Sequence, residues 1–175
     1  MAALASAALL AGCSAEGLSP DEAEVANIRK AHIVPNSSPG QLVNAFDRFC
    51  VEAPTSAKAR ETALRRANYV PYRSKPRKGV QIWVVDSKRP AIGISDAMCL
   101  VRARSRTGQT EKLRRYVAAT FPTARPIAPR PFGRDIEQAW ALPGDRILAT
   151  QRAAGLGNHT SYSLVLYTHN QGTNG

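Results

Sequence analysis

Hydrophobic patterns typical of helices and strands follow one another along this chain in the order helix, helix, strands, helix, strands. Helical spacing of apolar residues covers residues 39–50, 57–68 and 108–120. Runs rich in β-branched and aromatic residues predict strands over residues 79–86, 91–95, 97–105, 136–142, 146–152 and 161–169. Helices and strands do not alternate one by one, which argues against a doubly wound parallel sheet. We therefore expect an α+β fold, with an antiparallel sheet of four to five strands and helices packed on one face.

The segment 97–105 has two different faces, because side chains alternate along a strand. One face is apolar along its whole length and consists of Cys99, Val101 and Ala103. The other face changes from apolar to cationic and consists of Met98, Leu100, Arg102 and Arg104. Residues 91–95 and 97–105 fit either two strands or one strand with a bulge near Asp96.

The first 13 residues are the longest apolar run of the chain, and that run is too short to span a membrane as a helix. They carry no charge and end in small residues, which is typical of the apolar region of an export signal. The four residues Leu10-Ala11-Gly12-Cys13 resemble the lipobox of bacterial lipoproteins. In that family the lipobox cysteine is joined to diacylglycerol through its sulfur, and the signal is cut just before it. The resemblance implies these roles for Cys13.

The expected organisation combines this resemblance with the helix and strand patterns of the chain. Residues 1–12 are a signal peptide, 13–38 a lipid anchor and tether, 39–169 a single α+β domain, and 170–175 a disordered tail. In lipoproteins of Gram-negative bacteria, Asp after the cysteine tends to retain the protein at the inner membrane, and this chain has Ser14 there. The expected location is therefore the cell envelope, anchored to a membrane and facing the periplasm, with the outer membrane favoured. An ordinary cleaved signal, or an apolar helix with a core cysteine, remains an alternative.

Two cysteines remain if Cys13 carries lipid. Cys50 and Cys99 are expected to form a disulfide in an oxidising compartment, and two separate buried thiols are the alternative. In the chain-entropy model such a bridge contributes about 4 kcal/mol. The chain has no CxxC motif, and its three histidines lack ligand spacing with the cysteines, so we expect no metal and no cofactor.

The balance of charge is strongly basic, with 24 Lys and Arg against 13 Asp and Glu, a net charge of +11. Anionic partners are therefore favoured over cationic ones. Tyr69, Tyr72 and Trp83 lie among basic residues, as a base-stacking or phosphate-binding surface would require. A solvated surface that only aids solubility is the alternative. The predicted anion-binding patch comprises Arg73, Lys75, Arg77, Lys78, Lys88, Arg89, Arg102, Arg104, Arg106, Arg114 and Arg115.

No specific catalytic motif is present, and we assign no catalytic residue. Gly93-Ile94-Ser95-Asp96 lacks the second glycine of a nucleophile elbow. His159 lies near Ser161, and a histidine beside a hydroxyl could act as a base. A loop that satisfies its own hydrogen bonds is the more ordinary interpretation of that segment.

A weaker resemblance covers the stretch that begins at Phe46 (FDRFCV) and the helical segment that ends in ANYVPY. These are similar to small exported proteins of alphaproteobacteria that have no assigned function, and the resemblance implies no activity. The leading hypothesis is a non-enzymatic, lipid-anchored envelope protein. Its basic domain would bind an anionic lipid, a glycan or an envelope protein, with nucleic acid not favoured as a partner. The alternatives are a small envelope hydrolase that uses His159 and Ser161, and a secreted nucleic-acid-binding module.

Overall fold

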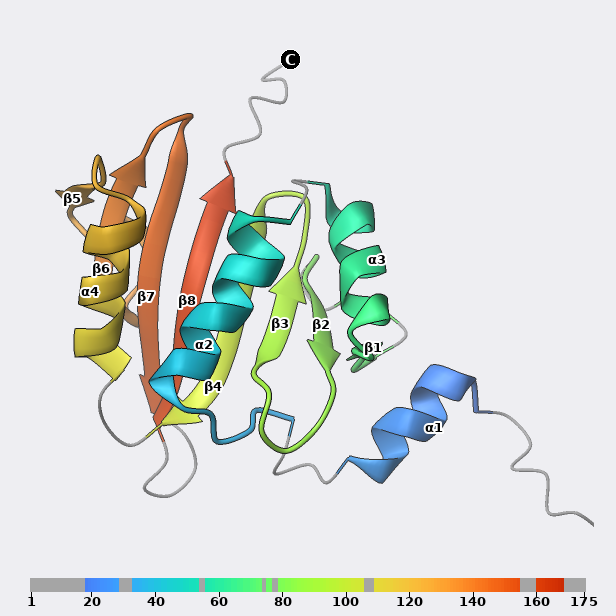
Figure 1. The fold of residues 1–175 in the computed structure, drawn as a ribbon. Coiled ribbons are helices and arrows are strands. Elements are labelled where there is room, and N and C mark those ends of the chain that lie inside the picture. The colour runs from blue at the N-terminus through green and yellow to red at the C-terminus, as the bar shows by residue number, and fades with distance from the viewer. Residues whose placement is uncertain are drawn as a thin grey trace, which may run out of the picture.

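The structure is a computed structural model, and it describes residues 18–28, 33–53, 56–73, 75–76, 79–105, 109–154 and 160–168. The expected signal peptide, Cys13 and the tail 170–175 lie outside the described residues. Within them, one antiparallel sheet has eight strands in the order β1-β2-β3-β4-β8-β7-β6-β5 (Figure 1). The strands are β1 (Val70–Pro71), β2 (Gln81–Val84), β3 (Ala91–Ile94), β4 (Met98–Ser105), β5 (Arg125–Ile127), β6 (Ile136–Leu142), β7 (Arg146–Ala154) and β8 (Thr160–Thr168).

The sheet consists of two four-stranded meanders that share one joint. Strands β1 to β4 pair in sequence order, and strands β5 to β8 do the same. The two meanders meet where β4 pairs with β8, from Met98 opposite Tyr167 to Ser105 opposite Thr160. The register of this one ladder therefore determines which side chains of the two halves are neighbours.

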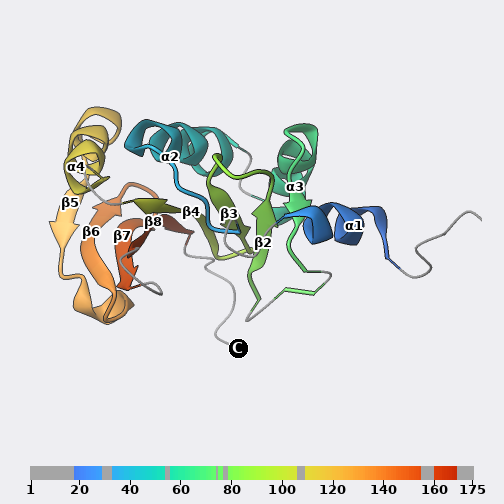
Figure 2. The same cartoon turned by 90° about the horizontal axis from the view of Figure 1, so that it is seen from below.

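The helices are α1 (Pro20–Asn27), α2 (Pro39–Phe46), α3 (Ala57–Arg66) and α4 (Gln109–Thr120), with a π-helix η2 (Asp47–Val51) and a 3-10 helix η3 (Arg130–Phe132). Figure 2 shows α2, α3 and α4 on the same side of the sheet. The start of α2 follows the sequence signal, because Ser38 and Gln41 form a reciprocal capping box with proline at the first helical position. Among the described residues, no helix is both long and apolar enough to cross a membrane.

The main core lies between these helices and the sheet. Cys99, Val101 and Ala103 of β4 are fully buried in it, as the alternation along this segment predicts. Residue Cys50 lies on η2 and forms a disulfide with Cys99, with the two Cα atoms 5.5 Å apart, which confirms the predicted bridge. The π-helix turns both Phe49 and Cys50 inward, so that adjacent side chains enter the core together. The bridge thus ties the end of the α2 segment to a strand at the centre of the sheet.

The prediction of four to five strands is wrong, because the sheet has eight. The two shortest strands, β1 and β5, are the outer strands of the sheet, and each contains a proline. The sequence around Pro126 resembles an extended linker because proline cannot donate to a strand ladder. An edge strand tolerates proline when the missing N–H faces away from its only neighbour.

The segment before α2 was expected to be a tether that precedes the domain, and its residues 33–38 instead pack on the sheet. The N–H of Arg104 donates to the carbonyl oxygen of Pro35 at 2.8 Å, and the N–H of Ser37 donates back to Arg104 at 3.3 Å. The hydroxyl of Ser37 also donates to the carbonyl oxygen of Lys88. Residues 33–38 therefore lie beside the end of β4, beyond the point where β3 has ended. We call residues 33–38 the strap.

The face of the sheet opposite the helices leaves no room above Gly93 of β3. A Cβ at this position would lie 2.8 Å from Cγ of Leu100 and 3.1 Å from Cδ1 of Ile82. We therefore expect Gly93→Ala to lower the free energy of unfolding by about 1–3 kcal/mol through overpacking. Gly40→Ala is the control, since Gly40 lies in α2 with Oγ of Ser38 at 3.9 Å as its nearest neighbour. This control should stabilise by up to about 1 kcal/mol in urea unfolding, and equal effects of both changes would contradict the packing argument.

Candidate functional site

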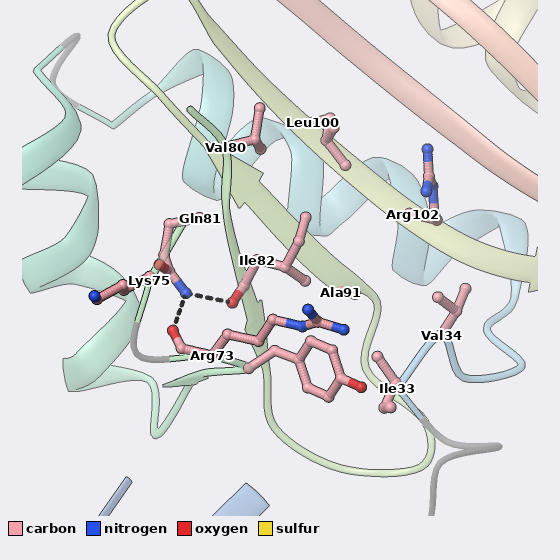
Figure 3. A pocket seen from close by; sticks show the side chains of 11 residues that line it. Ile33, Val34, Arg73, Lys75, Val80, Gln81, Ile82, Ala91, Leu100 and Arg102 are labelled. Carbon is pink, nitrogen blue, oxygen red and sulfur yellow. Dashed lines mark hydrogen bonds between the residues drawn. The ribbon is translucent and has the colours of Figure 1, made fainter. Parts of the chain in front are cut away.

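A pocket of about 390 Å³ lies on the face of the sheet opposite α2, α3 and α4 (Figure 3). Strand alternation places Ile82, Leu100 and Arg102 on this face, since their neighbours Trp83 and Val101 belong to the main core. The strap and the segment between β1 and β2 form its walls. The lining residues are Ile33, Val34, Tyr72, Arg73, Lys75, Val80, Gln81, Ile82, Ala91, Leu100 and Arg102.

Arg102 is the partly buried cation of this pocket. Its Nε donates to Oγ of Ser163 at 2.8 Å, and its Nη2 donates to Oε1 of Gln151 at 3.2 Å. Burial holds the pKa of its guanidinium below the ordinary value for arginine. No carboxylate of a described residue lies within 4 Å of it, although partly buried charges in proteins are ordinarily paired. Two neutral oxygens orient this side chain, and no carboxylate among the described residues compensates its charge.

Arg73 is a second cation at the pocket, on the segment that follows β1. The side-chain amide of Gln81 donates to the carbonyl oxygens of Arg73 at 2.9 Å and of Ile82 at 3.2 Å, which ties this segment to β2. The guanidinium lies over the ring of Tyr72, 5.4 Å from its centroid. In Figure 3 the Arg73 side chain extends toward the side of the pocket where Ile33 and Val34 lie, whereas Lys75 lies at the opposite side.

Other members of the predicted basic patch lie elsewhere. Arg89 is on the helix-covered side, where it pairs with Asp86 at 2.7 Å and donates to the carbonyl oxygen of Ala67. Lys88 precedes it in the same turn between β2 and β3. Arg104 shares the face of Arg102 but does not line the pocket. The remaining members are Arg114 and Arg115 on α4, and Arg77, Lys78 and Arg106, which lie outside the described residues.

The structure therefore gathers three of the predicted cations, Arg73, Lys75 and Arg102, at one pocket. Helix α4 does not bring its cations to this group. Arg115 pairs with Glu111 of its own helix, and Arg114 faces the side-chain amide of Gln138 on β6. Those cations of the predicted patch that the structure describes thus lie in several separate groups.

The aromatic residues that could stack on nucleic-acid bases are mostly unavailable. Tyr69 and Trp83 are each only 2% exposed. The ring of Tyr69 packs edge-on against Phe49, and its hydroxyl donates to the carbonyl oxygen of Pro90 at 3.0 Å. Burial raises the pKa of this hydroxyl to about 12. Stacking platforms require exposed rings, and of these three aromatics only Tyr72 lines the pocket.

Of the two residues in the hydrolase alternative, the structure describes only Ser161. His159 lies outside the described residues, and the hydroxyl of Ser161 donates to the carbonyl oxygen of Ala153 at 3.4 Å across the β7–β8 ladder. Within the described part of the chain, no three His, Cys, Asp or Glu side chains are grouped as a metal ion would need.

Sequence reasoning missed the residues that orient Arg102 and those that close the pocket. Ser163 lies directly opposite Arg102 on β8, and Gln151 lies opposite Ser163 on β7. The signal for this row is the strand register, which no pattern within one segment reveals. Ile33 and Val34 were missed because their segment was expected to be a tether. No protein-family model, curated protein or solved structure matches the chain.

A charge held without a carboxylate should contribute little to stability. We expect Arg102→Met to leave the free energy of unfolding unchanged or to raise it by up to about 1 kcal/mol, because the cost of burying the charge disappears with it. The control is Arg152→Met on the same sheet. Arg152 pairs with Glu137 at 2.5 Å and lies over the ring of Tyr162, so its loss should destabilise by about 1 kcal/mol. Urea unfolding measures both, and a larger loss at Arg102 than at Arg152 would show that Arg102 is structural.

Proposed function

We propose that this protein is a lipid-anchored protein of the bacterial cell envelope whose α+β domain binds an anionic ligand at Arg102 and Arg73. The role is binding, and we assign no bond-making or bond-breaking step to it. The anchor would be Cys13, as the lipobox resemblance implies, with the domain facing the periplasm.

The observation that carries the binding role is the environment of Arg102. A guanidinium has five N–H donors, and the bonds to Ser163 and Gln151 leave three without a partner among the described residues. Hydrogen bonds between a guanidinium and an anion are about twice as strong as neutral ones, and a partly dry site strengthens them further. An anionic ligand would supply the charge and the acceptors that this pocket lacks.

The proposed location is supported by the cysteines. The Cys50–Cys99 disulfide joins segments 49 residues apart, and such structural bridges persist mainly in oxidising compartments. An export signal that ends in a lipobox provides the route to such a compartment, so both features agree with the envelope.

The anion site is tested by titrating the full chain carrying Cys13→Ser with inorganic phosphate, followed by heteronuclear NMR of the arginine side-chain resonances. We expect the Arg102 and Arg73 resonances to shift, and Arg102→Gln to weaken the apparent affinity about tenfold or more, as loss of a charged hydrogen-bonding partner does. Arg114→Gln is the control, because Arg114 is an equally cationic position of α4 outside the pocket. If both variants weakened the affinity for phosphate equally, phosphate binding would depend on the overall surface charge and not on the pocket.

The anchor is tested by labelling cells of a Gram-negative bacterium with radioactive palmitate while they express the chain. The wild-type protein should incorporate label and fractionate with membranes. Cys13→Ser should remove the label and leave an uncut precursor, because serine has no thiol to form the thioether. Cys50→Ser is the control that retains the label. Label or membrane fractionation that survives Cys13→Ser would rule out this anchor.

A further inference from the structure

The floor of the pocket is apolar, although it lies on the sheet face opposite α2, α3 and α4. Antiparallel sheets with one open face normally carry polar residues on it. Here Ile82, Ala91 and Leu100 come from three neighbouring strands and meet on that face, with Val80 beside them (Figure 3). The Gly93 site lies beneath Ile82 and Leu100, whose side chains close over it. An apolar surface beside cations is typical of a binding site for a molecule that has both an apolar part and an anionic group.

The strap makes the pocket a concave site instead of a flat surface. Ile33 and Val34 form a wall beside Arg102, and backbone hydrogen bonds between Pro35, Ser37 and Arg104 hold the following residues in place. Gln109 of α4 also donates its side-chain amide to the carbonyl oxygen of Ser37 at 3.4 Å. The wall is therefore held by contacts with β4 and α4.

The segments next to the pocket walls in the sequence, and the C-terminal tail, have little that could cover this floor. The segments that adjoin the pocket walls in sequence are 29–32, 74 and 77–78, and none has an apolar side chain larger than alanine. Segments 29–32 and 77–78 carry cations, which would repel Arg73 and Arg102. The tail 169–175 reads HNQGTNG and has no apolar side chain at all. The complementary occupant has the opposite charge and an apolar body, which points to a separate ligand.

We propose that the pocket binds a single-chain amphiphile, with its hydrocarbon chain on the floor formed by Ile82, Ala91 and Leu100 and its anionic head at Arg102 and Arg73. This inference rests on the proposed anion-binding function and names the class of its ligand. A volume of about 390 Å³ lies near the lower end of the range for small-molecule sites. It suits one alkyl chain with a compact carboxylate or phosphate head and is too small for a two-chain phospholipid.

The roles of the two cations differ. The side chain of Arg102 is held by Ser163 and Gln151, so binding a ligand requires little further ordering of this side chain. Arg73 is exposed and lies at the mouth, where its charge attracts the head group and its contact with the Tyr72 ring limits its rotamers. Ser163 and Gln151 are positioning residues, since their contacts are with Arg102.

The test is calorimetric titration of the full chain carrying Cys13→Ser with inorganic phosphate, hexyl phosphate, decyl phosphate below its micellar concentration, and decanol. Each fully buried methylene raises affinity by about fourfold, so decyl phosphate should bind at least about tenfold more tightly than hexyl phosphate. Arg102→Gln should weaken decyl phosphate and leave decanol unchanged. Decyl phosphate and decanoate are compared to distinguish a phosphate from a carboxylate head.

A pair of matched variants separates the floor from the head site. Ile82→Thr should weaken decyl phosphate by about tenfold while inorganic phosphate binds as before. Ile147→Thr is the control, because Ile147 is a half-buried isoleucine on the same face of the sheet that does not line the pocket. Circular dichroism and urea unfolding verify that both variants are folded.

The outcomes distinguish this inference from the function on which it rests. Equal affinity for inorganic and decyl phosphate would leave the anion site standing and overturn the amphiphile. Decanol binding as tightly as decyl phosphate, with no effect of Arg102→Gln, would overturn the anionic head. Binding to phosphatidylglycerol vesicles without binding to monomeric decyl phosphate would identify a membrane surface as the partner instead. Absence of binding by every probe would overturn the proposed function itself.

Discussion

The β4–β8 ladder is the joint on which both the fold and the site depend. Eight registered residue pairs along it are the only strand pairing between the two meanders of the described sheet. Its register sets Arg102 opposite Ser163, and the next ladder sets Ser163 opposite Gln151. A slip by one residue would turn Arg102 into the core and expose Cys99 to the open face, which would also break the disulfide. Core, bridge and binding site are thus consequences of a single register.

Local patterns predicted much of this architecture, because the period of the apolar residues is a property of each segment alone. The start of α2 and the two faces of β4 follow from such patterns. The partnership of Cys50 with Cys99 was instead predicted from the number of cysteines and the expected oxidising compartment. The number of strands could not be predicted from local patterns, because the edge strands β1 and β5 have only two and three residues and contain proline. Short edge strands carry too few residues for a period to be recognised. Their pairing comes from neighbours that are distant in the sequence.

The same limit applies to the site. The alternation along β4 showed a face that changes from apolar Leu100 to cationic Arg102, and the pocket uses this change. Sequence reasoning then joined all nearby cations into one patch, because it had no means to assign charges to the two faces of the sheet. Arg89 illustrates this, since it pairs with Asp86 on the helix-covered side, whereas Arg102 lies on the opposite face. A net charge of +11 indicates the sign of a partner's charge, whereas only the tertiary structure shows which cations have no carboxylate beside them.

The N-terminal segment connects the proposed lipid anchor at Cys13 with the proposed amphiphile pocket. Asp21 of α1 pairs with Arg65 of α3 at 3.0 Å, and the strap that follows α1 forms a wall of the pocket. Cys13 and Leu18 are five Cα-to-Cα steps apart, and an extended chain spans at most about 3.6 Å per step, so the Cα of a lipidated Cys13 would lie within about 18 Å of the Cα of Leu18. An anchored domain would therefore remain close to a bilayer, where amphiphiles are far more concentrated than in water. Mass action at the membrane would then favour an occupied pocket even at a modest intrinsic affinity.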